Sequence, residues 1–223
     1  METAIRQGKI YILILVAFSI IGPVWADSGR TVKAENDRRA ERREQIRDDA
    51  VQRVIKSAER WMGVRELTGN NDHPMITKAM RLCRLDGNRG FPWCAAAMAE
   101  IHDEAAIPAP RSARVVDWFK TNVVWKREWG DLVGGINTNG MVGALFYQHL
   151  GRYGHIVLIV GQDKNNYYTL EGNTNLAGSR EGDGFYRKIR RKTSIAAMAD
   201  YTLSGTLWFE EYEEILKLYA DEK

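Results

Sequence analysis

The chain is poor in several features that would assign it to a class at once. Only two of its 223 residues are cysteine, which excludes a scaffold held by disulfides. Its 32 Lys and Arg residues oppose 29 Asp and Glu residues, and the net charge of +3 is too small to indicate a nucleic-acid partner by itself. Zinc-ligand spacings, a phosphate-binding glycine loop and a Gly-x-Ser-x-Gly elbow are missing, so we expect no metal and no other cofactor.

The apolar content is that of a folded protein. Hydrophobic residues make up 44% of the chain and aromatic residues 10%, which is too much for a disordered polypeptide. The length supports one substantial core and is too short for two ordinary enzyme domains with linkers. We therefore expect one globular domain with extensions.

The N-terminal extension has the pattern of a secretory signal. Arg6 and Lys9 precede the apolar stretch Ile10–Ile21, and small or modest residues occupy the positions up to Ala26 that a signal peptidase reads. These twelve residues, broken only by Ser19, rise only about 18 Å as a helix, whereas the hydrocarbon core of a bilayer is about 30 Å thick. The pattern predicts a signal peptide over residues 1–26, with an uncleaved membrane anchor as the alternative. Cleavage places the mature chain in the periplasm or outside the cell.

Charge and periodicity divide the rest of the chain into three parts. Residues 27–50 carry 14 charges, seven of each sign, which indicates a solvated helical lead-in. Residues 51–209 form the expected domain, which opens with an apolar helical stripe at Val51, Val54, Ile55, Ala58, Trp61 and Met62. Residues 210–223 are typical of an acidic amphipathic tail with one apolar stripe, formed by Tyr212, Ile215 and Leu218.

Within the domain, short β-branched or aromatic runs indicate an antiparallel sheet. The expected strands lie at Leu145–Tyr147, His155–Val160, Tyr167–Glu171 and Gly184–Arg190, with an edge strand over Thr202–Phe209. A turn-rich loop precedes a helix that places Ile76, Ala79, Met80 and Cys83 on one face. Helices followed by strands predict an α+β fold.

The segment from Phe91 to His102 has the composition of a buried helix whose first residue is a thiol. Pro92 and Trp93 stop the preceding chain, and the residues from Cys94 onward are almost uniformly small and apolar. The free N–H groups and the dipole at a helix N-terminus lower the pKa of a thiol and can hold a carbonyl oxyanion. Cys94 is therefore a candidate nucleophile, and the alternative is a small buried residue without chemistry.

Of the four histidines, His155 is the best placed to act as a base. It opens an apolar, β-branched strand, where a polar ring needs a partner. His102 lies eight residues along the helix that begins at Cys94, about 12 Å away by helical rise, which is too far. We expect His73 and His149 to be exposed loop residues without a role.

The strand that follows offers two partners for the ring of His155, Glu171 and Asn173. If Val160 pairs with Tyr167, simple register turns both side chains to the other face. A one-residue shift or a bulge at Gly172 is then needed for either to reach the ring. A Glu or Asn bonded to one imidazole nitrogen leaves the other free to take the proton of the thiol.

Together these segments resemble the CHAP family of cysteine, histidine-dependent amidohydrolases and peptidases. The resemblance covers about Val51–Arg191 and rests on four motifs in the same order, Pro92–Ala96, Gly154–Ile156, Glu171–Thr174 and Gly182–Lys188. One position departs from the pattern: family members often carry Gly-Asp before the strand that leads to the histidine, and Gly143-Ala144 stands here.

The resemblance implies a papain-like α+β fold with the nucleophile at the N-terminus of a buried helix packed on an antiparallel sheet. It implies Cys94 as the nucleophile, His155 as the general base, and Glu171 and Asn173 as the residues that orient the histidine. It also implies hydrolysis, through a thioester, of amide bonds in the stem peptide or cross-bridge of peptidoglycan, without a nucleic-acid partner or stable membrane insertion. A non-catalytic wall-binding module and a thiol acyltransferase on the same fold are the alternatives.

Three further features have both a structural and a functional interpretation. Cys83 could pair with Cys94 in an oxidising compartment, but its place on a helical stripe favours a core thiol. A group of aromatic residues is more typical of packing than of sugar stacking: Trp118, Phe119, Trp125 and Trp129. A basic run is more typical of a solvated strand face than of a site for an anionic wall polymer: Arg180, Arg187, Lys188, Arg190, Arg191 and Lys192.

Overall fold

The computed structural model describes residues 32–86, 90–147, 151–175 and 182–221. The signal peptide predicted over residues 1–26 lies outside these ranges, as do His149 and Arg180. The chain up to Gln45 forms one unit, in which residues 32–45 are helical and exposed or half-exposed, as expected for a solvated lead-in. The second unit runs over Ile46–Lys223 and contains the sheet.

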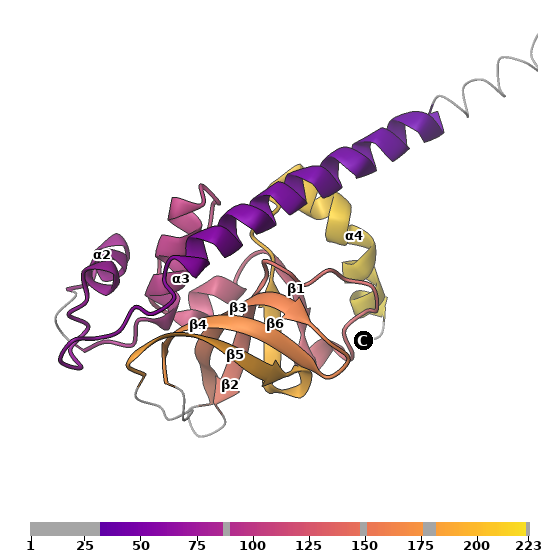
Figure 1. Cartoon of the computed structure of the whole chain (residues 1–223). Helices are drawn as coiled ribbons and strands as arrows, with labels where there is room; N and C mark the ends of the chain where they lie inside the picture. The colour runs from indigo at the N-terminus through magenta and orange to yellow at the C-terminus, as the bar shows by residue number, and fades with distance from the viewer. Residues whose placement is uncertain (1–31, 87–89, 148–150, 176–181, 222–223) are drawn as a thin grey trace, which may run out of the picture. The chain divides into compact units, whose positions relative to one another are not determined.

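The second unit is an α+β domain built on a six-stranded antiparallel sheet (Figure 1). Its strands are β1 (Val123–Lys126), β2 (Val142–Tyr147), β3 (Arg152–Gln162), β4 (Asn166–Thr174), β5 (Gly184–Arg191) and β6 (Ile195–Ala199). Their order across the sheet is β1-β6-β2-β3-β4-β5. The four strands expected between Leu145 and Arg190 are confirmed as β2 to β5, while β1 and β6 are additional.

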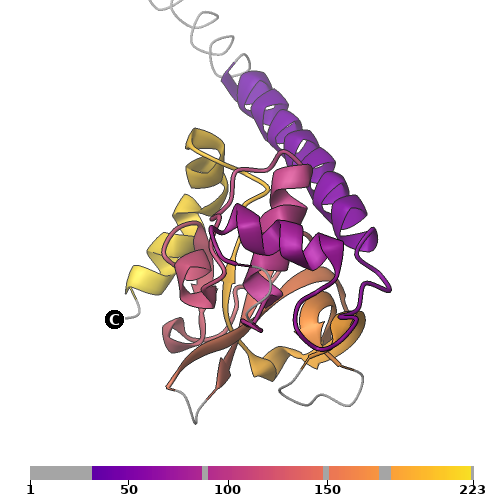
Figure 2. The ribbon, with the colours of Figure 1, turned by 90° about the vertical axis from the view of Figure 1, so that its left-hand side faces the viewer.

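Both faces of the sheet are covered, because apolar side chains alternate along the strands and point to opposite sides. On one face the strands pack with α2 (Pro74–Leu82) and α3 (Cys94–Glu104) through residues that include Ala144, Ile156, Leu158, Leu170 and Ala197. On the other face they pack with α4 (Thr206–Asp221) through residues that include Leu145, Val157, Ile159, Tyr167 and Met198. The ribbon accordingly shows α4 apart from α2 in both views (Figures 1 and 2).

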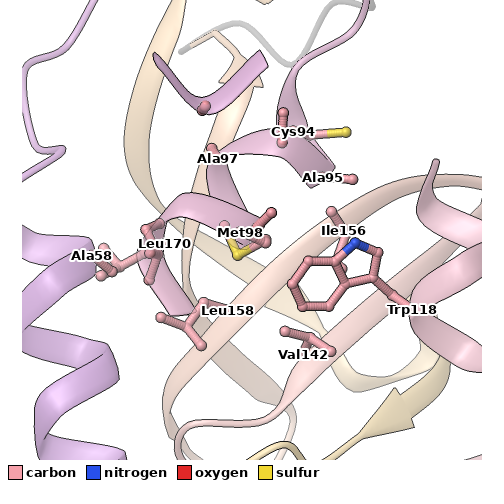
Figure 3. Packing of buried hydrophobic residues seen from close by; sticks show 14 of the residues in the cluster. Ala58, Cys94, Ala95, Ala97, Met98, Trp118, Val142, Ile156, Leu158 and Leu170 are labelled. Atoms are coloured by element: carbon pink, nitrogen blue, oxygen red, sulfur yellow. The ribbon is translucent and has the colours of Figure 1, made fainter. Parts of the chain in front are cut away.

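Helix α3 is the centre of the larger cluster. Its residues 94–102 are all buried, because small side chains allow the helix to approach the sheet closely. Figure 3 shows Met98 of α3 beside Leu158 and Leu170, with the indole of Trp118 near Ile156. The buried helix that the sequence predicts from Cys94 onward is confirmed.

The N-terminal helices complete this layer. Residues 46–59 are helical and bury part of the expected stripe, at Val51, Val54 and Ala58. Helix α2 begins at Pro74, and the Nδ1 atom of His73 accepts the backbone N–H of Met75. The expectation that His73 is an exposed loop residue is therefore wrong, because its half-buried ring caps the helix.

The C-terminal segment also differs from expectation. Thr202–Phe209 is not an edge strand, because α4 begins at Thr206, after Gly205 with a φ of +57°. The buried residues Trp208, Tyr212 and Tyr219 follow a helical spacing that starts before the expected tail. Of the expected apolar stripe, Tyr212 is buried and Leu218 is exposed. None of the helices within the described ranges has the length and apolar character needed to cross a bilayer.

Candidate active site

Cys94 is the first helical residue of α3, as the sequence predicts. The N-cap residue, Trp93, makes no side-chain capping bond, so the N–H groups of the first turn are not occupied by a capping side chain. His155 and the backbone N–H groups of Ala95 and Ile156 lie close enough to the thiol to lower its pKa. The sulfur therefore lies where the helix start meets β3.

Trp93 fixes the point at which α3 begins. Its indole N–H donates to Oε1 of Glu66 at 2.7 Å, and its ring stacks on Trp61 with centroids 6.2 Å apart. A Cβ atom at Gly172 would lie 2.6 Å from the Trp93 ring and 3.2 Å from Ala97. A larger residue at position 172 would thus push on the start of α3, which explains the glycine between Glu171 and Asn173.

The register of β3 and β4 places His155 and Glu171 on one face. The pairing of these strands shifts by one residue at Val160, after which Leu158 lies opposite Leu170. Beyond the shift, odd-numbered residues of both strands point to the same side of the sheet. The one-residue shift required by the sequence argument is therefore present.

The closed end of this hairpin differs from the expected register. Tyr167 pairs with Gln162 rather than with Val160. The strands are longer than expected, and Asp163 stabilises the tight loop by accepting the backbone N–H groups of Asn165 and Asn166. The irregularity near Gly172 lies on the other side of β4, in its pairing with β5.

His155 and Glu171 are joined by a hydrogen bond. Nε2 of His155 lies 3.0 Å from Oε2 of Glu171, and both side chains are buried. Because Nε2 is engaged by the carboxylate, Nδ1 is the ring nitrogen left for the thiol of Cys94. The Cys94–His155–Glu171 chain thus runs from α3 through β3 to β4: His155 is hydrogen-bonded to Glu171, and its charge acts on the thiol of Cys94.

Two residues outside the expected set hold Glu171. Arg190 of β5 donates from Nε to Oε1 at 2.8 Å and from Nη2 to Oε2 at 2.5 Å. The hydroxyl of Thr169 donates to Oε1 at 2.5 Å. The sequence singles out Arg190 only as one member of a basic run, so its part in the site was missed. The interpretation of Arg190 as a solvated residue is wrong, because its side chain is 22% exposed and its guanidinium binds a buried carboxylate.

The charges in this chain shift the pKa of each member. Burial would raise the pKa of Cys94, but the hydrogen bond and the charge of His155 outweigh it, so the pKa lies below its usual range. Burial would lower the pKa of His155, but its bonds to Cys94 and Glu171 raise the pKa to about 9. Burial would raise the pKa of Glu171, but Arg190 and His155 lower the pKa to about 2. A thiolate beside an imidazolium is therefore favoured near neutral pH.

Asn173, the second residue expected to orient the histidine, lies in β4, at the backbone turn after Glu171. It is half-buried in a left-handed backbone conformation, with a φ of +53°. Within the described part of the chain, Nε2 of His155 donates to Glu171, and Asn173 lines the cleft beside Cys94. Gly182 packs against this turn, since a Cβ atom there would overlap the backbone of Asn173 and Thr174.

A cleft of about 520 Å³ opens at the helix start. Cys94, His155 and Asn173 line it together with residues that precede α3, residues of the loop before Phe119, and residues at the β2–β3 end, including Phe91, Pro92, Ala113, Arg114, Val116, Tyr147, Arg152, Tyr153 and Gly154. Gly154 is required there, because a Cβ atom would lie 2.0 Å from the Tyr147 ring. The sulfur and the imidazole thus face a space that can admit a peptide-sized group.

The remaining cysteine and histidine do not join this site. Cys83 is a free, half-buried thiol packed against the core, which confirms the expected core position, and Cys94 is also free. Burial and the charge of Glu100 raise the pKa of Cys83 to about 11. His102 is buried, its Nδ1 lies 2.8 Å from the Met98 carbonyl oxygen, and burial lowers its pKa to about 4.

Most of the other flagged residues are structural. Trp118, Phe119 and Trp125 are buried, which confirms packing over sugar stacking for these three, and Trp129 is half-buried against Tyr219. The rest of the described basic run has exposed or half-exposed side chains. One of them, Arg187, forms an ion pair with Glu59 at 3.8 Å. At the position where the family often carries Asp, Ala144 is buried in the core.

Across the ranges that the structure describes, no group of three or more His, Cys, Asp or Glu side chains is arranged to hold a metal ion. Comparison of the chain with protein-family models, with curated proteins and with solved structures finds no match. A functional assignment therefore depends on the geometry of the site and on the resemblance of the motifs.

Proposed function

We propose that this chain is an exported cysteine amidase or peptidase of papain-like fold and CHAP type that hydrolyses amide bonds of bacterial peptidoglycan. The observation that carries the proposal is that Cys94, at the start of a buried helix, lines one cleft with His155, whose ring is hydrogen-bonded to Glu171. The order of the four motifs supports the family, and the N-terminal signal pattern supports action outside the cytoplasm.

In the acylation step, the Cys94 thiolate attacks the carbonyl carbon of the scissile amide. A carbon–sulfur bond forms, and the carbonyl oxygen takes up the negative charge. The backbone N–H of Cys94, which belongs to the free donors of the first turn of α3, can stabilise this oxyanion. His155 then gives its proton to the amide nitrogen, the carbon–nitrogen bond breaks, and the amine leaves.

In the deacylation step, neutral His155 takes a proton from a water molecule that attacks the thioester. The carbon–sulfur bond breaks, the acid product leaves, and the thiolate is paired with the imidazolium again. Glu171 remains ionised throughout and keeps Nε2 of the ring occupied, which directs Nδ1 towards the sulfur.

Digestion of purified peptidoglycan by the protein, followed by mass spectrometry of the products, tests the proposal. Wild-type protein should release fragments with a mass increase of 18 Da per amide cut, as hydrolysis requires, and Cys94→Ala should release none. Cys83→Ser is the matched control, because Cys83 lies outside the cleft, and should retain activity. Equal digestion by wild type and Cys94→Ala overturns the proposal.

The same products separate the alternatives. A thiol acyltransferase would join the acyl group to an added amine and leave a mass other than that of the hydrolysed peptide. A non-catalytic wall-binding module would sediment with peptidoglycan and leave its mass spectrum unchanged. Either result replaces the hydrolase assignment.

A further inference from the structure

Two arginine side chains give the cleft a positive wall. Arg114 precedes the 3-10 helix Val115–Phe119, and Arg152 is the first residue of β3. Both line the cleft that contains Cys94 and His155, and both are exposed. None of the described residues that line this cleft is acidic. The charge on the wall is therefore not balanced inside the cleft.

Two carboxylates near this wall, those of Asp117 and Glu128, each lie within 4.0 Å of a lysine. Asp117 forms an ion pair with Lys120 and accepts the hydroxyl of Ser112 at 2.7 Å; the charge of Arg114 adds only a smaller lowering of its pKa. Glu128 lies 3.7 Å from Lys126 and, with Arg127, lines the hollow next to the cleft rather than the cleft itself. Among the described residues, neither Arg114 nor Arg152 has a carboxylate within ion-pair distance.

The cleft continues past Arg152. A neighbouring hollow of about 590 Å³ shares Val116, Arg152 and Tyr153 with the cleft and adds the exposed ring of Phe146. Arg152 thus lies between the cleft and the neighbouring hollow. A peptide bound across both would lie against the guanidinium group of Arg152. This geometry fits a ligand longer than the single amide that is cut.

We infer that the ligand of this cleft is a peptide that carries a carboxylate near the scissile amide, bound by Arg114 and Arg152. The guanidinium group presents paired donors that match the two oxygens of a carboxylate, and the partly enclosed wall strengthens the interaction. The inference deepens the proposed function and rests on it for the position of the scissile amide. It assigns specificity to two residues that do not belong to the Cys94–His155–Glu171 chain.

The probe is a set of soluble peptidoglycan fragments with free carboxylates, compared with the same fragments after their carboxylates have been converted to primary amides. The value of kcat/KM is measured for wild type, for Arg114→Gln/Arg152→Gln, and for Arg191→Gln, a matched change at an exposed residue outside the cleft. Wild type and Arg191→Gln should prefer the carboxylate form by about tenfold. The double variant should lose this preference, so that its kcat/KM values for the two forms become equal.

A binding measurement separates the inference from the proposed function. Isothermal titration of Cys94→Ala protein with each form of the fragments should show the same preference, and the two arginine substitutions should abolish it. Discrimination in binding without turnover by wild type would overturn the hydrolase and leave the carboxylate site standing. Turnover without discrimination, or a preference unchanged in the double variant, overturns the carboxylate site and leaves the hydrolase standing.

Discussion

Arg190 holds both carboxylate oxygens of Glu171, at 2.8 Å to Oε1 and 2.5 Å to Oε2. Oε2 also lies 3.0 Å from the ring of His155. The Glu171 side chain is fully buried, so its charge depends on these partners rather than on water. Arg190, on the edge strand β5, therefore helps to orient His155 without touching it, because it holds the carboxylate to which the ring is bonded.

Replacing Arg190 by Gln should damage both stability and reactivity. The substitution leaves a buried carboxylate without its cation, which costs about 3 kcal/mol in the free energy of unfolding. It should also slow alkylation of Cys94 several-fold at neutral pH, since Glu171 can then take up a proton and no longer supports the imidazolium of His155. Urea denaturation and labelling with iodoacetamide measure the two effects.

Two variants control for the loss of a positive charge. Arg191→Gln removes the same charge from an exposed neighbour and should change neither quantity appreciably. Arg190→Lys should recover only part of both, because an ammonium cannot bind the two oxygens in parallel. Identical behaviour of Arg190→Gln and Arg191→Gln would show that Arg190 has no positioning role.

The contribution of Glu171 to stability should disappear in acid. Its pKa is about 2 in the folded chain against an ordinary value of 4.5, so the ionised carboxylate contributes stability that is fully present above pH 4.5. This contribution is lost as the pH falls through the interval between 4.5 and 2, and amounts to at most roughly 3 kcal/mol. Unfolding free energies of wild type and Glu171→Gln should therefore differ more at pH 6 than at pH 3. A difference that stays constant over this interval would contradict the pKa assignment.

Gly172→Ala should disturb the nucleophile without touching it. The added Cβ atom meets the Trp93 ring at 2.6 Å, and this ring fixes the start of α3. Overpacking of this kind costs about 1–3 kcal/mol, and the displaced helix start should slow alkylation of Cys94. Gly134→Ala is the control, since nothing lies within 4 Å of a Cβ atom there. Urea denaturation and alkylation kinetics of the two variants test the contact between position 172 and Trp93. Equal stabilities and equal alkylation rates would refute it.

Several parts of the site could be predicted because their signals are local. A small, apolar segment after Pro92 and Trp93 indicates a buried helix with Cys94 at its start. A histidine at the end of a β-branched run indicates a polar group beside a core. Glycine at positions 154 and 172 indicates that an aromatic ring approaches the backbone closely, although the sequence does not say which ring.

Other parts depend on register and could not be predicted. Arg190 reaches Glu171 from its place opposite Tyr167 in the pairing of β5 with β4, and no local pattern specifies that register. The shift at Val160 brings the face of Glu171 to that of His155, and the sequence does not specify where it falls. The sequence predicts a strand over Thr202–Phe209 rather than the helix that begins at Thr206. The buried aromatic residues of this helix start before the charged tail in which its helical spacing can be recognised.

The most direct test of the central claim is the pH dependence of Cys94 alkylation by iodoacetamide, measured in Cys83→Ser protein. The rate should rise with a midpoint below the pKa of an ordinary thiol, about 8.5, and be near its maximum at neutral pH, because the imidazolium of His155 stabilises the thiolate. His155→Ala should move the midpoint upwards. A midpoint at or above 8.5 that is the same with and without His155 would contradict a thiolate–imidazolium pair.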